Sequence, residues 1–465
     1  MADATADAAK TEYRGRATPA KLLEVARYYL FIGIVGFGGP MVHIAMMEDD
    51  LVGEDSKEWT DQSVFMEGLA ICNMLPGPAS TQLGIFMGWI YAGTKGALVA
   101  GFFFMPTFVL VVFFSWLYFA YQQVPAVEAV FYGINPVVIG LIVGACYSMT
   151  RSAFEEGRTD TEFEVGGESW NVDYLLVILL VATTAVQAVL GPNPVLLFIA
   201  SGLVGVAVYR SDWVRTNARR LAPWAILGAV AGLLFVLRDR VLEALGPAVR
   251  GALETSPIWG ALIALWANPW IQLFAFMIYT GSFIYGGGLV LIPFIETYVV
   301  SEFGWMTGRE FVDGIAIGQL SPGPVVMTTA FVGYKLMLDV SGGVVAVAVI
   351  GALVATIGAF GPSFAFIIGF FPYFAKIREN ELIQTALVAV NAAVIGAILG
   401  ATVILAEESF FVEQPTVPIP AAGAVLDLFA VLLALVTYWL FVRGVHAAYL
   451  IAAGGAIGVG AFFLV

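Results

Sequence analysis

Long apolar segments fill this chain, and polar residues gather between them. A first series of apolar segments runs at about 22–47, 61–75, 79–93, 96–120, 126–149, 173–190, 194–209 and 222–237. A second series runs at about 269–300, 309–320, 325–338, 343–371, 382–406, 423–442 and 445–464. A helix needs about 20 apolar residues to cross a hydrocarbon core of about 30 Å, and many of these segments have that length. The pattern predicts an all-α polytopic membrane protein.

Glycine and proline interrupt the apolar sequence at matching places in the two series. The pieces on either side of the Pro-Gly-Pro at 76–78 and at 322–324 are each too short to cross a bilayer. Because Pro-Gly-Pro cannot continue a helix, we expect a helical hairpin or a pair of half-helices at each. The first segment of each series is also broken, by FGGP at 37–40 and by YGGG at 285–288.

The breaks belong to an internal repeat. Residues 59–78 align with residues 305–324 without a gap, at a constant offset of 246. The repeat continues to NPVVIGLIVGA from Asn135 and NAAVIGAILGA from Asn391, at an offset of 256. The larger offset places an insertion of about ten residues near 336–345 of the second copy. Helix breaks at matching places in two apolar halves point to the substrate site of a transporter.

Positive charge predicts how the copies are oriented, because cytoplasmic loops carry an excess of Lys and Arg. The tail, the 210–221 loop and the 373–380 loop carry positive residues and should be cytoplasmic, whereas 407–420 carries none and should lie outside. An odd number of linking helices, here three, would place the second copy in the opposite orientation across the membrane. We therefore expect inverted-topology repeats and a cytoplasmic N-terminus, although the three arginines between 238 and 250 on the predicted outer face argue against this.

These predictions divide the chain into five parts. They are a cytoplasmic tail at 1–21, a first repeat at 22–150, an acidic loop with three linking transmembrane helices at 151–268, a second repeat at 269–406, and an outer loop with a final two-helix hairpin at 407–465.

Composition excludes several classes of protein. The 465 residues are 60% hydrophobic and 12% charged, so lipid must cover the apolar surface and the expected location is the cell membrane. A net charge of −14 argues against a nucleic-acid partner. Two histidines and two cysteines are too few for a usual metal centre, and the sequence offers no reactive cluster of an enzyme. We expect no cofactor and no metal, and a homodimer stays open.

The Pro-Gly-Pro breaks carry the chemistry of an anion site. A helix that starts after each break directs unpaired backbone N–H groups and its positive dipole end toward the break. Such ends bind anions without a charged side chain, which suits a tetrahedral oxyanion better than a metal cation. Glycine and proline also serve tight helix packing, but two matching breaks favour a functional site. The flanking polar residues are Asn73, Ser80, Thr81 and Gln82 at the first break and Gln319, Ser321, Thr328 and Thr329 at the second.

Each break has one carboxylate nine residues ahead of its first proline. This residue is Glu67 in the first copy and Asp313 in the second. Carboxylates inside a membrane are costly and often carry protons, so we expect this pair to couple protons to transport. His43 lies one helical turn after Pro40 and has no counterpart, because the repeat places Leu291 there. A titrating or anion-donating histidine and a packing histidine fit this position equally well.

The motifs resemble those of the chromate ion transporter family in its long, two-domain form. The resemblance rests on FGGP-x-x-H at 37–43, Pro-Gly-Pro with TQLGIFMGW after it, and GQLSPGPVVMTTAFVGY at 318–334, and it covers residues 22 to 460. It implies an inner-membrane protein that exports chromate, driven by the proton-motive force, with sulfate as a competing anion. The residues that the family's motifs carry over are Gly38, Gly39, Pro40, His43, Pro76, Gly77, Pro78, Gln82, Gly286, Gly287, Gln319, Pro322, Gly323 and Pro324.

One departure and two alternatives accompany this hypothesis. The family often has a basic residue soon after the Gly-aromatic pair of the first hairpin, whereas here Gly88-Trp89 leads to Ile90-Tyr91 and the nearest cation is Lys95. A sulfate or other oxyanion carrier on the same fold stays open, as does an anion channel. The expected mechanism is alternating access around a midplane anion site built from the two Pro-Gly-Pro helix ends.

Overall fold

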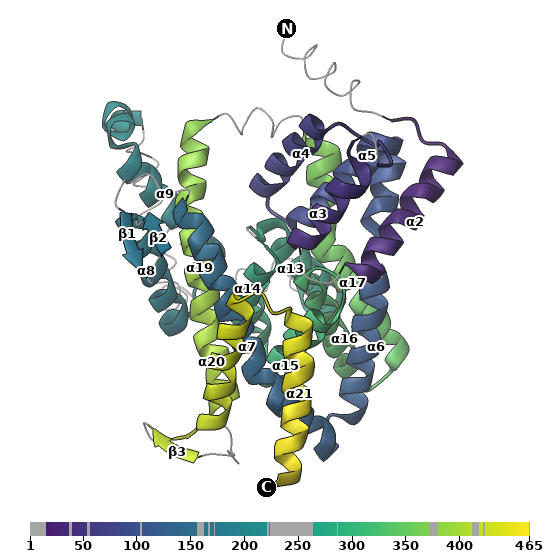
Figure 1. Ribbon diagram of the computed structural model, residues 1–465, viewed down its shortest axis with the longest axis vertical. Helices are drawn as coiled ribbons and strands as arrows, with labels where there is room; N and C mark the ends of the chain where they lie inside the picture. The colour runs from purple at the N-terminus through teal and green to yellow at the C-terminus, as the bar shows by residue number, and fades with distance from the viewer. Residues whose placement is uncertain are drawn as a thin grey trace.

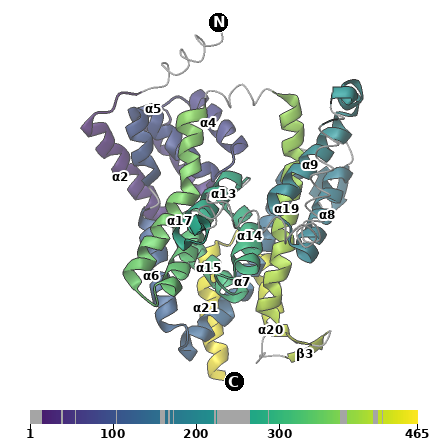
Figure 2. The same cartoon turned by 180° about the vertical axis from the view of Figure 1, so that it is seen from behind.

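The fold is known from a computed structural model, drawn from two sides in Figures 1 and 2. It describes residues 15–36, 40–53, 56–102, 105–155, 162–165, 168–171, 173–220, 223, 264–285, 287–371, 380–411, 418–421 and 424–464. The predicted linking helix at 222–237, most of the 373–380 loop, and Gly38, Gly39 and Gly286 lie outside the described residues.

Helices form nearly all of the first half. They are α2 (Pro19–Val35), α3 (Pro40–Leu51), α4 (Gln62–Met74), α5 (Ala79–Gly101), α6 (Met105–Tyr121), α7 (Pro125–Glu155), α8 (Tyr174–Leu190) and α9 (Pro194–Tyr209). Within α5, Ala92 and Gly93 leave the helical conformation, so the helix consists of two pieces as the apolar pattern predicts.

The second half repeats this arrangement. It contains α13 (Pro269–Phe283), η2 (Gly288–Val290), α14 (Leu291–Phe294), the π-helix η3 (Ile295–Glu302), α15 (Gly308–Leu320), η4 (Val325–Met327), α16 (Thr328–Val340), α17 (Val345–Ala365), the π-helix η5 (Phe366–Phe370) and α19 (Glu381–Phe410). The final hairpin consists of α20 (Leu428–Val442) and α21 (Ala447–Leu464).

Two short β-hairpins occur where the sequence predicts only loops or the start of a helix. Strands β1 (Glu162–Val165) and β2 (Glu168–Asn171) pair antiparallel inside the predicted acidic loop. Strands β3 (Pro418–Ala421) and β4 (Ala424–Asp427) pair in the same way before α20, which therefore begins later than the predicted residue 423. Residues 162–165 alternate charged and apolar side chains, the period of a strand, over a length too short to stand out.

Several helices are long enough to cross a membrane, as the apolar pattern predicts. Among the described residues these are Ala79–Tyr121, Pro125–Phe154, Val345–Phe370 and Glu381–Phe410. Helix α9 and the helix Ser211–Arg220 form a further candidate span, bent by 110°. The chain is thus a multi-pass membrane protein, and its described residues are helical apart from two small hairpins and the connecting turns.

Each Pro-Gly-Pro joins two helices that fold back on one another. Gly68 of α4 packs on the ring of Phe86 in α5, so a Cβ placed on Gly68 would lie less than 3.0 Å from that ring. Gly314 of α15 packs in the same way on Phe331 of α16. The same glycine–phenylalanine contact in both copies closes each hairpin. The predicted helix breaks are confirmed.

Beyond each break the chain folds back on itself through a pair of glycines. In the first copy the two pieces of α5 pack together, with Gly88 against the backbone of Gly96, and in the second copy α16 packs on α17, with Gly333 against the backbone of Gly351. The first pair is 8 positions apart and the second 18, so the predicted ten-residue insertion falls between equivalent contacts. In the second copy the insertion lengthens the connection between α16 and α17, whereas the first copy has a tight turn at 92–93 in the same place.

The repeat-equivalent helices α7 and α19 start at opposite ends of the molecule. The beginning of α7 packs on the C-terminal part of α21, with Gly133 against Gly458. The beginning of α19 lies by the end of α9, where Arg210 and Glu381 form an ion pair. Figure 1 shows the C-terminus and β3 at one end, and the starts of α2 and α19 at the other.

The start of α2, the basic helix Ser211–Arg220 and the start of α19 lie at one end of the molecule, whereas the turn between α6 and α7 and the β3–β4 hairpin lie at the other (Figure 1). Which membrane face each end meets remains a prediction.

Candidate functional site

The first Pro-Gly-Pro break adopts a conformation that requires glycine. Gly77 has φ +128°, a value that L-residues with side chains rarely adopt. Its N–H donates to the carbonyl oxygen of Ile284, at the end of α13 in the other repeat. A Cβ on Gly77 would lie less than 3.0 Å from Nε2 of Gln82 and from Oγ of Ser363. Gln82 in turn donates from Nε2 to the Pro76 carbonyl oxygen at 2.6 Å, which fixes the turn.

The second break is held by a hydroxyl from the first repeat. Thr107 of α6 donates from Oγ1 to the carbonyl oxygen of Pro322. A Cβ on Gly323 would lie less than 3.0 Å from Oγ1 of Thr107. Nearby, Gly288 of η2 packs against Val325, so the break in the first helix of this repeat lies on its Pro-Gly-Pro break. Three broken segments therefore gather in the middle of the structure, around α13 and α14 (Figure 1).

The contacts at the two breaks are related by the repeat. Thr107 and Ser363 occupy equivalent positions at an offset of 256, and each touches the break of the other repeat. The breaks thus lie where the two repeats meet. Neither residue belongs to the site predicted from the sequence. The signal that would have found them is the match of Pro-Thr-Phe at 106–108 with Pro-Ser-Phe at 362–364.

Several buried polar atoms around the breaks have no hydrogen-bond partner among the residues that the structure describes. Buried polar groups are nearly always paired, so such atoms indicate that a bound ion or water completes them. Hydroxyls can donate to an anion, and four of the five atoms are hydroxyl oxygens. The five are Ser80 Oγ, Thr81 Oγ1, Gln82 Oε1, Thr328 Oγ1 and Ser363 Oγ. Because all these side chains are neutral, an anion here would be held by dipoles rather than by a full positive charge.

Other predicted site residues satisfy local backbone groups. Thr329 bonds the Val326 carbonyl oxygen at 2.8 Å, and Ser321 bonds that of Gly318 at 2.7 Å. Asn73 is exposed on α4, away from the buried groups. The remaining members are Pro40, which begins α3, Pro78 and Pro324, which precede the helices after the breaks, Gly287 with φ +131°, and half-buried Gln319.

His43 of α3 contacts the end of α2 across the break in the first helix. Its ring is fully buried, and Nε2 lies 2.7 Å from the carbonyl oxygen of Gly36 at the end of α2. The equivalent carbonyl in the second repeat is that of Ile284, which accepts from Gly77 instead. In the first repeat the His43 side chain thus contacts the carbonyl oxygen that a backbone N–H binds in the second repeat. This contact favours a packing and positioning role for the histidine.

The two predicted carboxylates differ in environment. Asp313 is 2% exposed on α15, accepts a hydrogen bond from the Tyr118 hydroxyl at 2.6 Å, and interacts with the Asn135 amide. Glu67, its equivalent on α4, is exposed. The carboxylate of the second repeat is therefore buried and hydrogen-bonded, whereas its equivalent in the first repeat, Glu67, is not buried.

A cavity of about 370 Å³ leads to Asp313. Its lining includes Asp313 and Tyr118, together with the polar residues Gln122, Gln123, Glu128, Arg309 and Glu310. Glu128 and Arg309 form an exposed ion pair at 3.4 Å near the turn between α6 and α7. The carboxylate is thus buried yet close to a polar cavity at the end of the molecule where the C-terminus lies.

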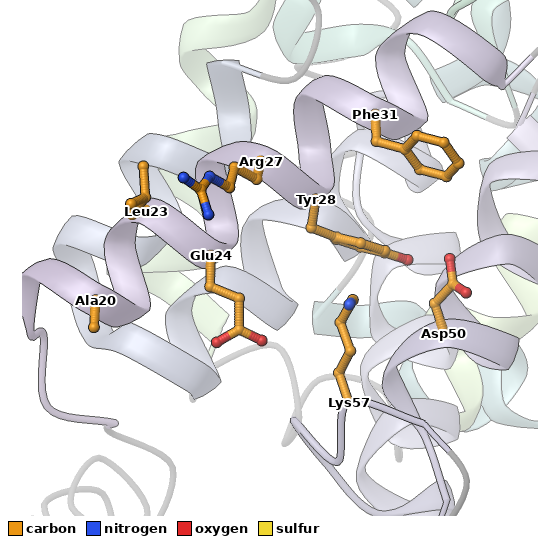
Figure 3. A pocket seen from close by; sticks show the side chains of 8 residues that line it. All are labelled: Ala20, Leu23, Glu24, Arg27, Tyr28, Phe31, Asp50 and Lys57. Atoms are coloured by element: carbon orange, nitrogen blue, oxygen red, sulfur yellow. The ribbon is translucent and has the colours of Figure 1, made fainter.

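A second cavity, of about 520 Å³, lies at the opposite end between α2, the last turn of α3 and Lys57 in the segment after α3 (Figure 3). Side chains of both charges surround it, and the Lys57 amino group points toward the ring of Tyr28. Glu24 on its wall accepts hydrogen bonds from Trp59 and Tyr91, at 3.1 and 2.6 Å, which ties α2 to the first hairpin. This cavity is separate from the helix breaks.

The comparison with known families decides the identity. Residues 23–206 and 271–459 match the profile of the family described as Chromate transporter. The chain belongs to the chromate transporter family. The two matched segments begin close to the predicted starts of the two repeats, and the resemblance inferred from the motifs is confirmed. Because this is a family of transporters, the chain is not an enzyme.

Full-length relatives in the chromate transporter family support the assignment. The chain is 30% identical over 398 residues to a "Probable chromate transport protein" of Synechococcus elongatus, covering 85% of this chain and 87% of the relative. It is 30% identical over 398 residues to the "Chromate transport protein" of Cupriavidus metallidurans, covering 85% of each. It is 30% identical over 429 residues to that of Pseudomonas aeruginosa, covering 88% and 86%. No solved structure matches this chain significantly.

Proposed function

We propose that the protein is a secondary active transporter that exports chromate across the cell membrane, driven by the proton gradient. Chromate is supported as cargo by the family and by the names of relatives at 30% identity. The observation that carries the mechanism is the crossed contact at the breaks. Ser363 of the second repeat touches Gly77, and Thr107 of the first repeat binds Pro322.

Neutral donors would bind the anion. The N-terminus of α5 begins directly after the first break with no side-chain cap, so its free N–H groups and dipole face the break. The buried hydroxyls of Ser80, Thr81 and Ser363 are available to donate as well. Hydrogen bonds to a charged acceptor are stronger than those between neutral groups, and a dry site strengthens them further. A tetrahedral dianion fits this set of donors.

Movement of one repeat against the other would open the site alternately to the two sides. We infer inverted-topology repeats because α7 and α19 start at opposite ends and because equivalent hairpins pack through equivalent glycines. The Thr107–Pro322 and Ser363–Gly77 contacts cross between the repeats, so a rocking motion must break or exchange them. Both breaks would then change shape together.

Asp313 is our assignment for the proton carrier. It is buried, it accepts from Tyr118, and a polar cavity reaches it from one end of the molecule. In the predicted orientation this is the outer end, from which protons would enter during export. Glu67 is exposed on α4, so we expect it to contribute less than the sequence alone predicts.

Radiolabelled chromate in everted membrane vesicles tests the proposal. With a proton gradient, vesicles that contain the protein should accumulate chromate, and excess sulfate should compete. Vesicles prepared from cells without the protein give the background. Sulfate accumulation without chromate accumulation would support the carrier mechanism and contradict chromate as its substrate. Chromate flux at rates beyond those of a carrier and independent of the gradient would identify a channel, and no flux of either anion would overturn the proposal.

A further inference from the structure

A second buried carboxylate lies in the second repeat, away from the Pro-Gly-Pro breaks. Glu296 is 2% exposed and belongs to the π-helix η3. Ser301 donates to its Oε1 at 2.9 Å, and Thr297 donates to its Oε2 at 3.3 Å. π-Helical turns are rare and occur often at functional sites, because they displace backbone and side chains from regular positions.

No counter-charge accompanies this carboxylate in the described part of the chain, where the ion pairs within 4.0 Å do not include Glu296. A buried charge without a partner is strongly unfavourable, so proteins pair it, protonate it or bind a cation to it. The equivalent residue of the first repeat, Glu48, differs: it is partly exposed and accepts from Gln62 at 2.7 Å. The requirement for a partner is therefore specific to Glu296.

A linking helix supplies a further oxygen to this place. Gln187 of α8 is fully buried and donates from Nε2 to Oγ1 of Thr297 at 3.0 Å. Its amide oxygen, Oε1, has no hydrogen-bond partner in the described part of the chain. The position of Gln187 is fixed, since its Cβ packs against Gly400 of α19 with no room for a side chain there.

We propose that Glu296, Thr297, Ser301 and Gln187 form a binding site for a sodium ion. The cluster offers two carboxylate oxygens, two hydroxyl oxygens and one unpaired amide oxygen, with one negative charge. Hard cations prefer such oxygen ligands, and broken helices of transporters commonly provide cation sites. The ion balances the buried charge and gives Gln187 Oε1 its partner. The binding of sodium does not depend on which anion is transported; a role in coupling rests on the proposed transport.

A proton fits the cluster less well than a cation. Both oxygens of Glu296 accept hydrogen bonds from hydroxyls, an arrangement that stabilises the ionised carboxylate relative to the protonated acid. A proton also satisfies a single acceptor, whereas a metal ion contacts several oxygens at once. The cluster has an excess of acceptors, which favours the cation.

The test is the thermal stability of the purified full-length protein as sodium chloride replaces choline chloride at constant ionic strength. A ligand that binds the folded state raises the unfolding temperature in a saturable manner. Sodium should do so in the wild-type protein, and potassium should do so less. Even outer-shell changes alter metal affinity about 10–100-fold, so Glu296→Gln and Gln187→Leu should each raise the half-maximal sodium concentration by at least about tenfold.

Glu48→Gln is the matched control, because it makes the same change at the equivalent carboxylate of the first repeat, and it should keep the sodium response. If Glu296→Gln does not fold, Gln187→Leu and Ser301→Ala still test the site. The proposal is wrong if wild-type stability is the same in sodium and choline, or if folded Glu296 and Gln187 variants keep the wild-type response. A dependence on pH that is identical in both salts would assign the cluster to a proton and also overturn sodium.

Discussion

At the scale of single residues, equal positions in the repeat do not mean equal environments. Glu67 and Asp313 stand at the same place before their breaks, yet Glu67 is exposed and Asp313 is 2% exposed. The difference arises because Tyr118 and Asn135 from α6 and α7 cover Asp313. Helices α4 and α15 both mix polar and apolar residues, and which of their carboxylates is covered depends on helices that are distant in the sequence. The sequence therefore identified both carboxylates and could not rank them.

Replacement of Asp313 by Asn should remove the response of chromate export to the proton gradient. One pH unit is worth about 1.4 kcal/mol per proton, which is about tenfold in an accumulation ratio for one coupled proton. Asp313→Asn keeps the shape and the contact with Tyr118 and should show almost no change in that ratio. The measurement is chromate accumulation in vesicles at two pH differences. Glu67→Gln serves as the control and should respond nearly as the wild type does; an unchanged response of Asp313→Asn would remove its assigned role.

At the scale of elements, each break is a glycine-dependent turn clamped by the other repeat. Local rules located the breaks, because a Pro-Gly-Pro sequence cannot continue a helix. The same rules did not predict the clamps, since Thr107 and Ser363 lie on long helices that are distant in the sequence. The short hairpin at 162–171 was also missed, because two strands of four residues give too little pattern.

Alanine at the glycines of the two breaks should inhibit transport while the protein still reaches the membrane. Gly77→Ala and Gly323→Ala each place a Cβ less than 3.0 Å from a neighbouring side chain, and Gly77 also has φ +128°. Strain of about 1–3 kcal/mol at a site that must move corresponds to a decrease of roughly 5–150-fold in chromate flux. Chromate flux per amount of protein in the membrane measures the effect.

Gly361→Ala is the matched control for these substitutions. It makes the same chemical change in α17, two residues from Ser363, where a new Cβ would meet nothing within 4 Å. Flux of this variant should stay close to that of the wild type. Equal losses in all three variants would indicate a general effect on the helices and would contradict the assignment of the breaks as the site.

At the scale of the whole molecule, two sets of segments lie at opposite ends. The basic helix Ser211–Arg220 shares its end with the start of α2, and the turn between α6 and α7 lies near the C-terminus (Figures 1 and 2). Charge along the sequence predicted this grouping, because each loop is retained on one side according to its Lys and Arg content. The packing of α7 on α21 and of α9 on α19 agrees with it.

Labelling of single cysteines with a membrane-impermeant reagent should reveal the orientation. Gln123→Cys, in the turn between α6 and α7, should react in intact cells, whereas Asp212→Cys should react only after permeabilisation. Both positions are exposed, and the native Cys72 and Cys146 are buried, so background labelling should be low. The reverse pattern would place the N-terminus outside. Labelling of both sites from the same side would contradict the arrangement of the repeats.

The sequence by itself determined the membrane class, the positions of the helix breaks, the two repeats and the family. These properties depend on local apolar length, on residues that stop helices and on matching of one half with the other, all of which are visible along the chain. Only the tertiary structure decided that each break meets a hydroxyl of the opposite repeat, that Asp313 is covered while Glu67 is not, and that Gln187 reaches Glu296. Those contacts depend on which face of an apolar helix turns toward a distant partner, and a helix surrounded by lipid and other helices carries no local pattern that records it.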